Sequence, residues 1–267
     1  MIEMKVNTLQ VDGASIYYEI RGSGPILLLI SGGFGDASVL NILYEYLIDK
    51  FTVITYDRRG YTRSKIDDPT QELRLETESD DVHRLLTTIS NEPAYVFGSS
   101  YGAVIALDYA ARYPKQLHPL VAHEPSALYL TSIRTEAEQA LNESIEKSSK
   151  HNNPTIAYKT ISKMVGLNPE KIKAQKTDNN LNFFIQNEVP MLDTYRYDFK
   201  ALKKAMKQTQ IIIAAGSTSP HNSIGYLGAV AISEHLGVDI VKFPGDHIGY
   251  GRNPEKFVEK LLEVFND

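Results

Sequence analysis

The 267-residue sequence contains no cysteine. Disulfides, thiolate metal sites, iron–sulfur clusters and a cysteine nucleophile are therefore excluded. A block of basic residues is also missing, since 28 Lys and Arg against 33 Asp and Glu give a formal net charge of −5. Such a chain has little attraction for a phosphate backbone or an anionic lipid surface, so we expect neither a nucleic acid nor a membrane as a partner.

Long hydrophobic runs are absent as well. The most apolar stretches, 26–30 and 211–215, are far shorter than the roughly 18 residues that a membrane helix needs. The first seven residues lack the apolar core of a secretion signal, so a cytoplasmic location is the expectation. With 42% hydrophobic and 23% charged residues, the composition is typical of a globular protein with a sizeable core.

Strand and helix patterns alternate over the first 125 residues. The Asp12-Gly13 pair between two β-prone runs predicts a hairpin near the N-terminus. Continuous apolar runs of the kind found in strands covered on both faces then take turns with helical patterns. The expected strands are 6–11, 16–20, 26–30, 51–56, 94–98 and 117–123. This alternation predicts an α/β protein with a mostly parallel central sheet and helices on both faces.

The alternation stops after Pro125 and resumes at residue 209. Residues 126–208 are helix-like, polar and rich in Lys, Asn and Glu, and strand patterns return at 209–215 and 238–243. We therefore expect one core domain made of residues 1–125 and 209–267, with a helical cap of residues 126–208 inserted after the sixth strand. Such an insertion commonly forms a wall of a substrate pocket.

The segment Gly98-Ser99-Ser100-Tyr101-Gly102 fits the pattern G-x-S-x-G and stands between a predicted strand and a predicted helix. A strand-to-helix turn this sharp strains the backbone of its central serine, and the glycines let the two elements pass closely. Ser100 would then be exposed above the sheet, beside a helix N-terminus whose dipole favours negative charge. The alternative is that Ser99 and Ser100 only cap the helix, but a capping serine does not require glycines on both sides.

Together these features resemble the α/β-hydrolase fold, and the resemblance covers nearly the whole chain. It rests on the hairpin, the loop 31–35, the segment 56–60, the serine motif, the helical insertion and a late histidine, His247. In that family the catalytic residues follow in the order serine, acid, histidine. The resemblance implies Ser100 as the nucleophile.

Among the 7 histidines, His247 is the expected base, because it lies in a glycine-flanked loop just after the last strand. A histidine at this place can take the serine proton and later protonate the leaving group. Otherwise His247 would be a loop histidine that bonds to its own backbone. No pair of histidines has a spacing suited to a metal, so we expect neither a metal nor another cofactor.

The acid departs from the usual pattern of the family, in which an aspartate follows the penultimate strand. Ser219 stands at that position here, and a serine cannot hold a charged imidazolium as a carboxylate can. Glu124 directly follows the strand after the serine helix, where some α/β-hydrolases carry their acid. The resemblance therefore implies Glu124 as the acid, with Asp246, next to the histidine, and then Glu188 as alternatives.

The resemblance also implies two backbone N–H groups that receive a developing oxyanion. One would be the amide of Tyr101 and the other that of Gly33 in the glycine-rich loop, with Phe34 as the next candidate. Asp57 and Arg58 are expected to brace the loops beneath the site. The candidate pocket walls are Phe183, Phe184, Val189, Met191 and Tyr195, together with Phe34 and Tyr101.

Two alternatives belong to other classes of protein. The loop 33–38 imitates G-x-G-x-x-G, and Asp57 stands where a ribose-binding acid belongs, which is the pattern of an NAD(P)-binding oxidoreductase. That pattern lacks its third glycine, since Ser38 stands there, and it explains neither the serine motif nor His247. Ser219 in place of the usual acid leaves open a non-catalytic, ligand-binding protein of the same fold.

The sequence thus predicts a serine hydrolase that acts through an acyl-enzyme with a Ser-His-Glu triad. Its expected partner is a small to medium, partly apolar acyl compound. A carboxylic ester is the default substrate, while amide, lactone, thioester and carbon–carbon substrates, and lyase chemistry, stay open.

Overall fold

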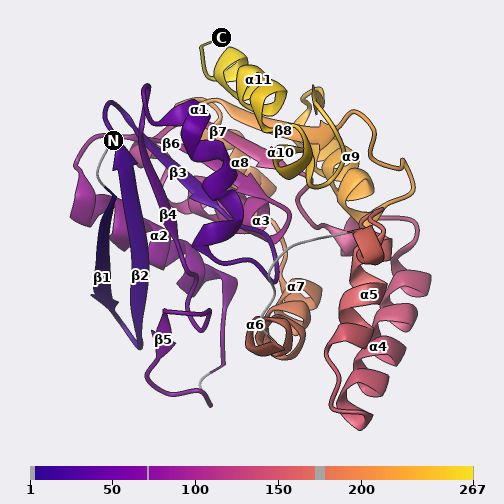
Figure 1. The fold of residues 1–267 in the computed structure, drawn as a ribbon. Coiled ribbons are helices and arrows are strands. Elements are labelled where there is room, and N and C mark those ends of the chain that lie inside the picture. Colours follow the sequence, from indigo (N-terminus) through magenta and orange to yellow (C-terminus); the bar gives the residue numbers. More distant parts are fainter. Residues whose placement is uncertain (1–3, 71, 172–177, 267) are drawn as a thin grey trace.

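A computed structural model describes residues 4–70, 72–171 and 178–266, and one mixed sheet organises them (Figure 1). The strand order is β1-β2-β4-β3-β6-β7-β8-β9, and β5 pairs with β2 beside this path. β2 runs antiparallel to β1, β4 and β5, whereas the pairs from β4 through β3 to β9 are parallel. The strands are β1 (Lys5–Val11), β2 (Ala14–Gly22), β3 (Ile26–Ile30), β4 (Thr52–Tyr56), β5 (Lys65–Ile66), β6 (Ala94–Ser99), β7 (Leu117–His123), β8 (Ile211–Gly216) and β9 (Val241–Phe243).

Helices cover both faces of this sheet, so the predicted fold class is confirmed. One face carries α2 (Leu75–Ile89), α3 (Tyr101–Arg112), α8 (Phe199–Ala205) and α9 (Ile224–Leu236). The other face carries the 3₁₀ turn η1 (Ala37–Leu43), α1 (Tyr44–Leu47), α10 (Gly249–Arg252) and α11 (Pro254–Asn266). Within β3, Leu28 packs into the first layer and Leu29 into the second, which explains why this strand is apolar without alternation.

Between β7 and β8 the chain leaves the sheet and forms a group of helices, which we call the insertion (Figure 1). It consists of η3 (Leu128–Leu130), α4 (Arg134–Lys150), α5 (Thr155–Met164), η4 (Pro169–Lys171), α6 (Asp178–Phe183), the π-helical turn η5 (Phe184–Glu188) and α7 (Val189–Thr194). The helix α8, although it falls in the range 126–208, packs on α3 of the core. A short 3₁₀ turn, η2 (Pro114–Gln116), joins α3 to β7.

The strand before the insertion is the seventh and not the sixth, because Lys65 and Ile66 form β5. Two residues are too few to show a strand pattern in a sequence, which is why the prediction counted one strand fewer. Among the described helices, none combines the length and the apolar surface that crossing a bilayer requires.

Parallel strands place the loops that follow them at one edge of the sheet. The glycine-rich loop follows β3, Ser100 follows β6, Glu124 follows β7, Ser219 comes shortly after β8 and His247 shortly after β9. Because the carboxyl ends of parallel strands meet at the same edge, these residues converge there from widely separated parts of the sequence.

Candidate active site

Ser100 occupies a strained turn between β6 and α3. Its backbone angles are φ 55° and ψ −119°, a conformation that costs energy in a residue with a side chain. A methyl group added at Gly98 would lie 2.4 Å from the carbonyl oxygen of Gly102, and one at Gly102 would lie 2.3 Å from that of Ile30. Both glycines are therefore sterically required. The side chain of Ser100 makes no capping hydrogen bond to α3, which argues against the capping interpretation.

Glu124 holds His247 by a short hydrogen bond. Glu124 Oε2 lies 2.6 Å from His247 Nδ1. The other carboxylate oxygen, Oε1, accepts a hydrogen bond of 2.9 Å from the N–H of Gly216 and a second one from the hydroxyl of Ser219. Because the carboxylate occupies Nδ1, the ring nitrogen that is left for chemistry is Nε2.

The buried carboxylate of Glu124 is held in its charged form. Burial on its own would raise the pKa of Glu124, but the hydrogen bond and the charge of His247, the neighbouring His123 and the hydrogen bond from Ser219 outweigh burial and lower it to about 2. A carboxylate with such a pKa stays negative throughout the working range of an enzyme. It can therefore stabilise an imidazolium on His247.

Gly225, in the first turn of α9, leaves the space in which this pair sits. A methyl group there would lie 2.8 Å from Glu124 Oε2 and 3.0 Å from His247 Nδ1. The positive end of the α9 dipole also favours the charged carboxylate. Gly225 could not be singled out from the sequence, because one glycine in a helical pattern does not reveal which distant side chain fills the space above it.

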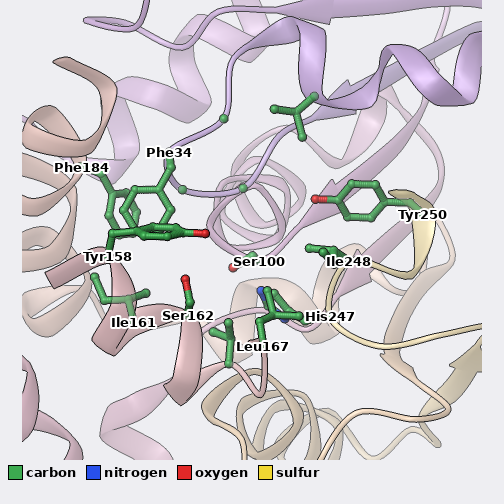
Figure 2. A pocket seen from close by; sticks show the side chains of 15 residues that line it. Phe34, Ser100, Tyr158, Ile161, Ser162, Leu167, Phe184, His247, Ile248 and Tyr250 are labelled. Carbon is green, nitrogen blue, oxygen red and sulfur yellow. The ribbon is translucent and has the colours of Figure 1, made fainter. Parts of the chain in front are cut away.

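Ser100 and His247 line the same two cavities. Figure 2 shows the His247 ring beside Ser100, between the cluster of Phe34, Tyr158 and Phe184 on one side and Ile248 and Tyr250 on the other. Over the described ranges, no hydrogen bond joins the Ser100 hydroxyl to a ring nitrogen of His247. Hydrogen bonds between nucleophile and base are often long in the free enzyme and shorten when substrate binds.

The glycine-rich loop passes directly over the nucleophile. A methyl group at Gly32 would lie 3.1 Å from Cβ of Ser100, and one at Gly33 would lie 2.3 Å from the ring of Phe184. In the part of the chain that the structure describes, the backbone N–H groups of Gly33, Phe34 and Tyr101 donate no hydrogen bond. Amides without a partner beside a serine are what an oxyanion hole needs.

Arg58 braces the glycine-rich loop from below, in the role expected from the sequence. Its Nη1 donates to the carbonyl oxygens of Ser31 and Gly32, at 2.9 Å each. Its Nε and Nη2 donate to the carboxylate of Glu188 at 3.0 to 3.2 Å, and both side chains of this ion pair are buried. Since Glu188 belongs to η5, the pair ties the insertion to the loop over Ser100.

A second carboxyl group, that of Glu78 on α2, faces the same arginine. Its Oε2 lies 3.5 Å from Arg58 Nε, and its Oε1 accepts a 2.9 Å hydrogen bond from the hydroxyl of Tyr101. Burial and the negative charge of Glu188 raise the pKa of Glu78 to about 8, although Arg58 opposes them. Two carboxyl groups thus share one cation, and Glu78 carries a proton at neutral pH. Glu78 was not predicted from the sequence, because a glutamate in an amphipathic helix usually faces solvent.

The alternative acids are engaged elsewhere. The carboxylate of Asp246 pairs with Arg252 and accepts a 3.2 Å hydrogen bond from the N–H of Ile248. Glu188 is held by Arg58, as described above. Neither makes a hydrogen bond to His247 in the described residues, so Glu124 is the acid that the geometry favours.

Asp57 has no oxygen left for a ribose. It is fully buried, its Oδ1 accepts a 2.9 Å hydrogen bond from the N–H of Ala37, and both its oxygens bind the guanidinium of Arg63 at 2.7 Å. These contacts brace the loops, as expected, and contradict the dinucleotide interpretation. The described residues also contain no group of three or more His, Cys, Asp or Glu side chains that could hold a metal ion.

Two cavities meet at Ser100 and His247. The smaller one measures about 130 Å³ and lies beside the glycine-rich loop (Figure 2). The larger one measures about 560 Å³ and extends beneath α4, α5 and α7 of the insertion. Phe184 lines both cavities, Phe34 lines the smaller one, and Tyr101 and Val189 line the larger one, as the sequence predicted.

Three predicted wall residues lie outside both cavities, which corrects the sequence-based prediction. Phe183 packs on Gly60 and on the ring of Tyr61, at 5.3 Å between ring centroids. Tyr195 donates a 2.9 Å hydrogen bond to Asp108 of α3, and the sulfur of Met191 lies 3.7 Å from the Tyr101 hydroxyl. These residues fasten the insertion and the chain after it to the core. Sequence spacing does not distinguish this role from lining a pocket.

The strand order and the serine turn, with Glu124 and His247 beside it, define an α/β hydrolase, and the chain belongs to the α/β hydrolase family. Residues 25–144 match the sequence model of the alpha/beta hydrolase fold. Over 261 residues, 96% of this chain and 94% of the other, the sequence is 41% identical to "Uncharacterized hydrolase YraK" of Bacillus subtilis.

Two further proteins show how the family varies. The chain is 32% identical over 142 residues, 52% of its own length and 49% of the other's, to 2-(acetamidomethylene)succinate hydrolase of Mesorhizobium japonicum. The solved structure of an esterase from Exiguobacterium antarcticum shares the fold with a TM-score of 0.75 and 19% identity, over 96% of this chain and 97% of that one. The protein is therefore a hydrolase of α/β fold.

Proposed function

We propose that the protein is a serine hydrolase that cleaves a carboxylic ester through an acyl-enzyme. The observation that carries the proposal is the hydrogen bond of 2.6 Å between Glu124 and His247, formed next to a serine in a strained strand-to-helix turn. A strained backbone costs stability, and both backbone strain and strongly shifted pKa values concentrate at catalytic sites. A ligand-binding protein of the same fold would need neither.

In the proposed reaction, Ser100 Oγ attacks the ester carbonyl while His247 Nε2 takes its proton. Glu124 stabilises the imidazolium, and the amides of Gly33 and Tyr101 receive the oxyanion, with Phe34 as the next candidate donor. His247 then protonates the departing alkoxide, and water releases the acid by the reverse sequence of proton transfers. The insertion acts as a cap that shields the site from solvent.

The names of related proteins include an esterase, a carbamate hydrolase and a hydrolase of 2-(acetamidomethylene)succinate. We propose an ester because an alkoxide leaves a tetrahedral intermediate far more readily than an amide anion does, so an ester demands less of the general acid than an amide, whose nitrogen must be protonated before it leaves. The apolar walls around Ser100 suit an acyl compound without charge.

Labelling with a fluorophosphonate tests the proposal, because only an activated serine reacts rapidly with this probe. We expect one adduct, located at Ser100 by mass spectrometry, and hydrolysis of p-nitrophenyl acetate that disappears in Ser100→Ala. Ser99→Ala is the matched control, because the neighbouring Ser99 is buried and should not react. The absence of an adduct, or undiminished hydrolysis by Ser100→Ala, would contradict the proposed function.

A further inference from the structure

The two cavities beside Ser100 differ about fourfold in volume, with about 560 Å³ against 130 Å³. Both are lined by Ser100, His247 and Phe184, so the reacting carbonyl would sit where they join. An ester has one group on each side of its reacting centre. The site therefore offers one large and one small space to these two groups.

The larger cavity is apolar along most of its wall. Aliphatic side chains reach it from three helices of the insertion, among them Leu141 and Ile145 of α4, Ile161 of α5, and Val189 and Leu192 of α7. Apolar walls gain free energy only from a ligand that leaves water without losing hydrogen bonds. This wall therefore suits a hydrocarbon chain.

Polar side chains of the larger cavity include Glu138, Asn142 and Gln186, and of these Asn142 and Gln186 are exposed to solvent. Glu138 is engaged by Arg134, at 2.5 Å. In the ranges that the structure describes, neither cavity is lined by a lysine or an arginine. A substrate carboxylate bound against these described walls would lose its hydration without gaining a cation.

Resting on the proposed serine hydrolase function, we infer that the substrate is an uncharged ester with one apolar chain of medium length and one small group. The chain occupies the larger cavity beneath α4, α5 and α7. The small group occupies the cavity beside the glycine-rich loop. Since no lysine or arginine among the described residues lines either cavity, an ester that carries a free carboxylate is a poor substrate.

Two ester series on the wild-type protein test this inference. The first comprises methyl acetate, butanoate, hexanoate and octanoate, and the second comprises the acetates of methanol, butanol, hexanol and octanol. We expect kcat/KM to rise in one series by about threefold to fourfold for each methylene that is buried, and to fall in the other. Two flat or falling series would overturn the inference.

The charge requirement is measured with dimethyl succinate and monomethyl succinate, which differ by one carboxylate. We expect the neutral diester to react at least tenfold faster than the anion. Equal rates, or a faster reaction of the anion, would show that a cation compensates the charge and would also overturn the inference.

A substitution that fills part of the larger cavity tests whether this cavity determines the preferred chain length. In whichever ester series rises, Ile145→Trp should lower the ratio of kcat/KM for the longest ester to that for the shortest at least tenfold. Ile133→Trp is the matched control, because Ile133 stands just before the same helix and lines neither cavity, so the ratio should stay at the wild-type value. An unchanged ratio in a folded Ile145→Trp protein contradicts the inference. Normal fluorophosphonate labelling with no chain preference would remove this inference alone and leave the proposed function intact.

Discussion

Ser219 donates its hydroxyl hydrogen to Oε1 of Glu124, while Oε2 of the same carboxylate binds His247. Ser219 stands where many α/β hydrolases carry their acid, and the sequence indicated no role for its hydroxyl group. In the structure, this hydroxyl group holds the carboxylate that binds His247.

Ser219→Ala should lower kcat/KM by roughly 10- to 100-fold, because a buried hydrogen bond to a charged group contributes about 1.5–3 kcal/mol. The loss should appear in kcat more than in KM, since Ser219 lines neither cavity. Steady-state kinetics with an ester substrate measures both. Ser217→Ala, two residues earlier and exposed, is the control, and an equal effect of both variants would refute the assigned role.

Glu124→Gln should lower kcat by roughly 10³- to 10⁴-fold, because a neutral amide neither stabilises the imidazolium nor selects the same tautomer of His247. Asp246→Asn should have little effect, since Asp246 pairs with Arg252. The double variant Glu124→Gln with Ser219→Asp should recover part of the activity, by returning a carboxylate to the position that the family commonly uses. If Asp246→Asn were inactive and Glu124→Gln active, Asp246 and not Glu124 would be the acid.

Gly225→Ala should lower kcat while leaving the free energy of unfolding nearly unchanged. The added methyl group would lie 2.8 Å from Glu124 Oε2, which forces the Glu124–His247 pair apart. Alanine in a helix is more stable than glycine by about 0.5–1 kcal/mol, which offsets part of the steric cost. Urea unfolding and kinetics on the same samples separate the two effects. Gly251→Ala, where a methyl group meets nothing within 4 Å, should be active.

Glu188→Ala should reduce the free energy of unfolding by about 3–5 kcal/mol, because it leaves the buried Arg58 without its main partner. Activity should also fall, since Arg58 holds the carbonyl groups of the loop over Ser100. Lys260→Ala, which breaks the more exposed pair with Glu263, should change stability by less than about 1 kcal/mol. Chemical denaturation measures the free energy of unfolding of both variants. Similar small losses in the two would show that the buried pair of Arg58 and Glu188 does not stabilise the fold.

Glu78 should make the folded state less stable as the pH rises toward 8. The pKa of Glu78 is about 8 in the folded state and 4.5 ordinarily. Between these pH values the folded state therefore binds more protons than the unfolded state does. The stability that protonated Glu78 contributes falls over this range and is lost as the pH passes through 8. Glu78→Gln removes this dependence. In thermal unfolding at pH 5, 7 and 9, the unfolding temperature of the variant should increase relative to that of the wild-type protein as the pH rises. Parallel curves for the two proteins would contradict the raised pKa of Glu78.

Local patterns predicted the sheet and the strand-to-helix turn at Ser100 well. The run 26–30 and the motif around Ser100 each owe their structure to neighbouring residues, so their sequence suffices. Glu124 was identified by resemblance and by its position after a strand. Gly225 and Glu78 were missed, and Phe183 and Tyr195 were misplaced, because these roles depend on which helix faces meet across the molecule.

β7 and β8 are hydrogen-bonded neighbours, with His123 level with Ala214. Glu124 follows the end of β7, and the turn that contains Ser219 follows the end of β8. The two side chains consequently meet beside the imidazole of His247. The pairing of β7 with β8 thus lets a hydroxyl group at one strand end act on the imidazole through the carboxylate at the other.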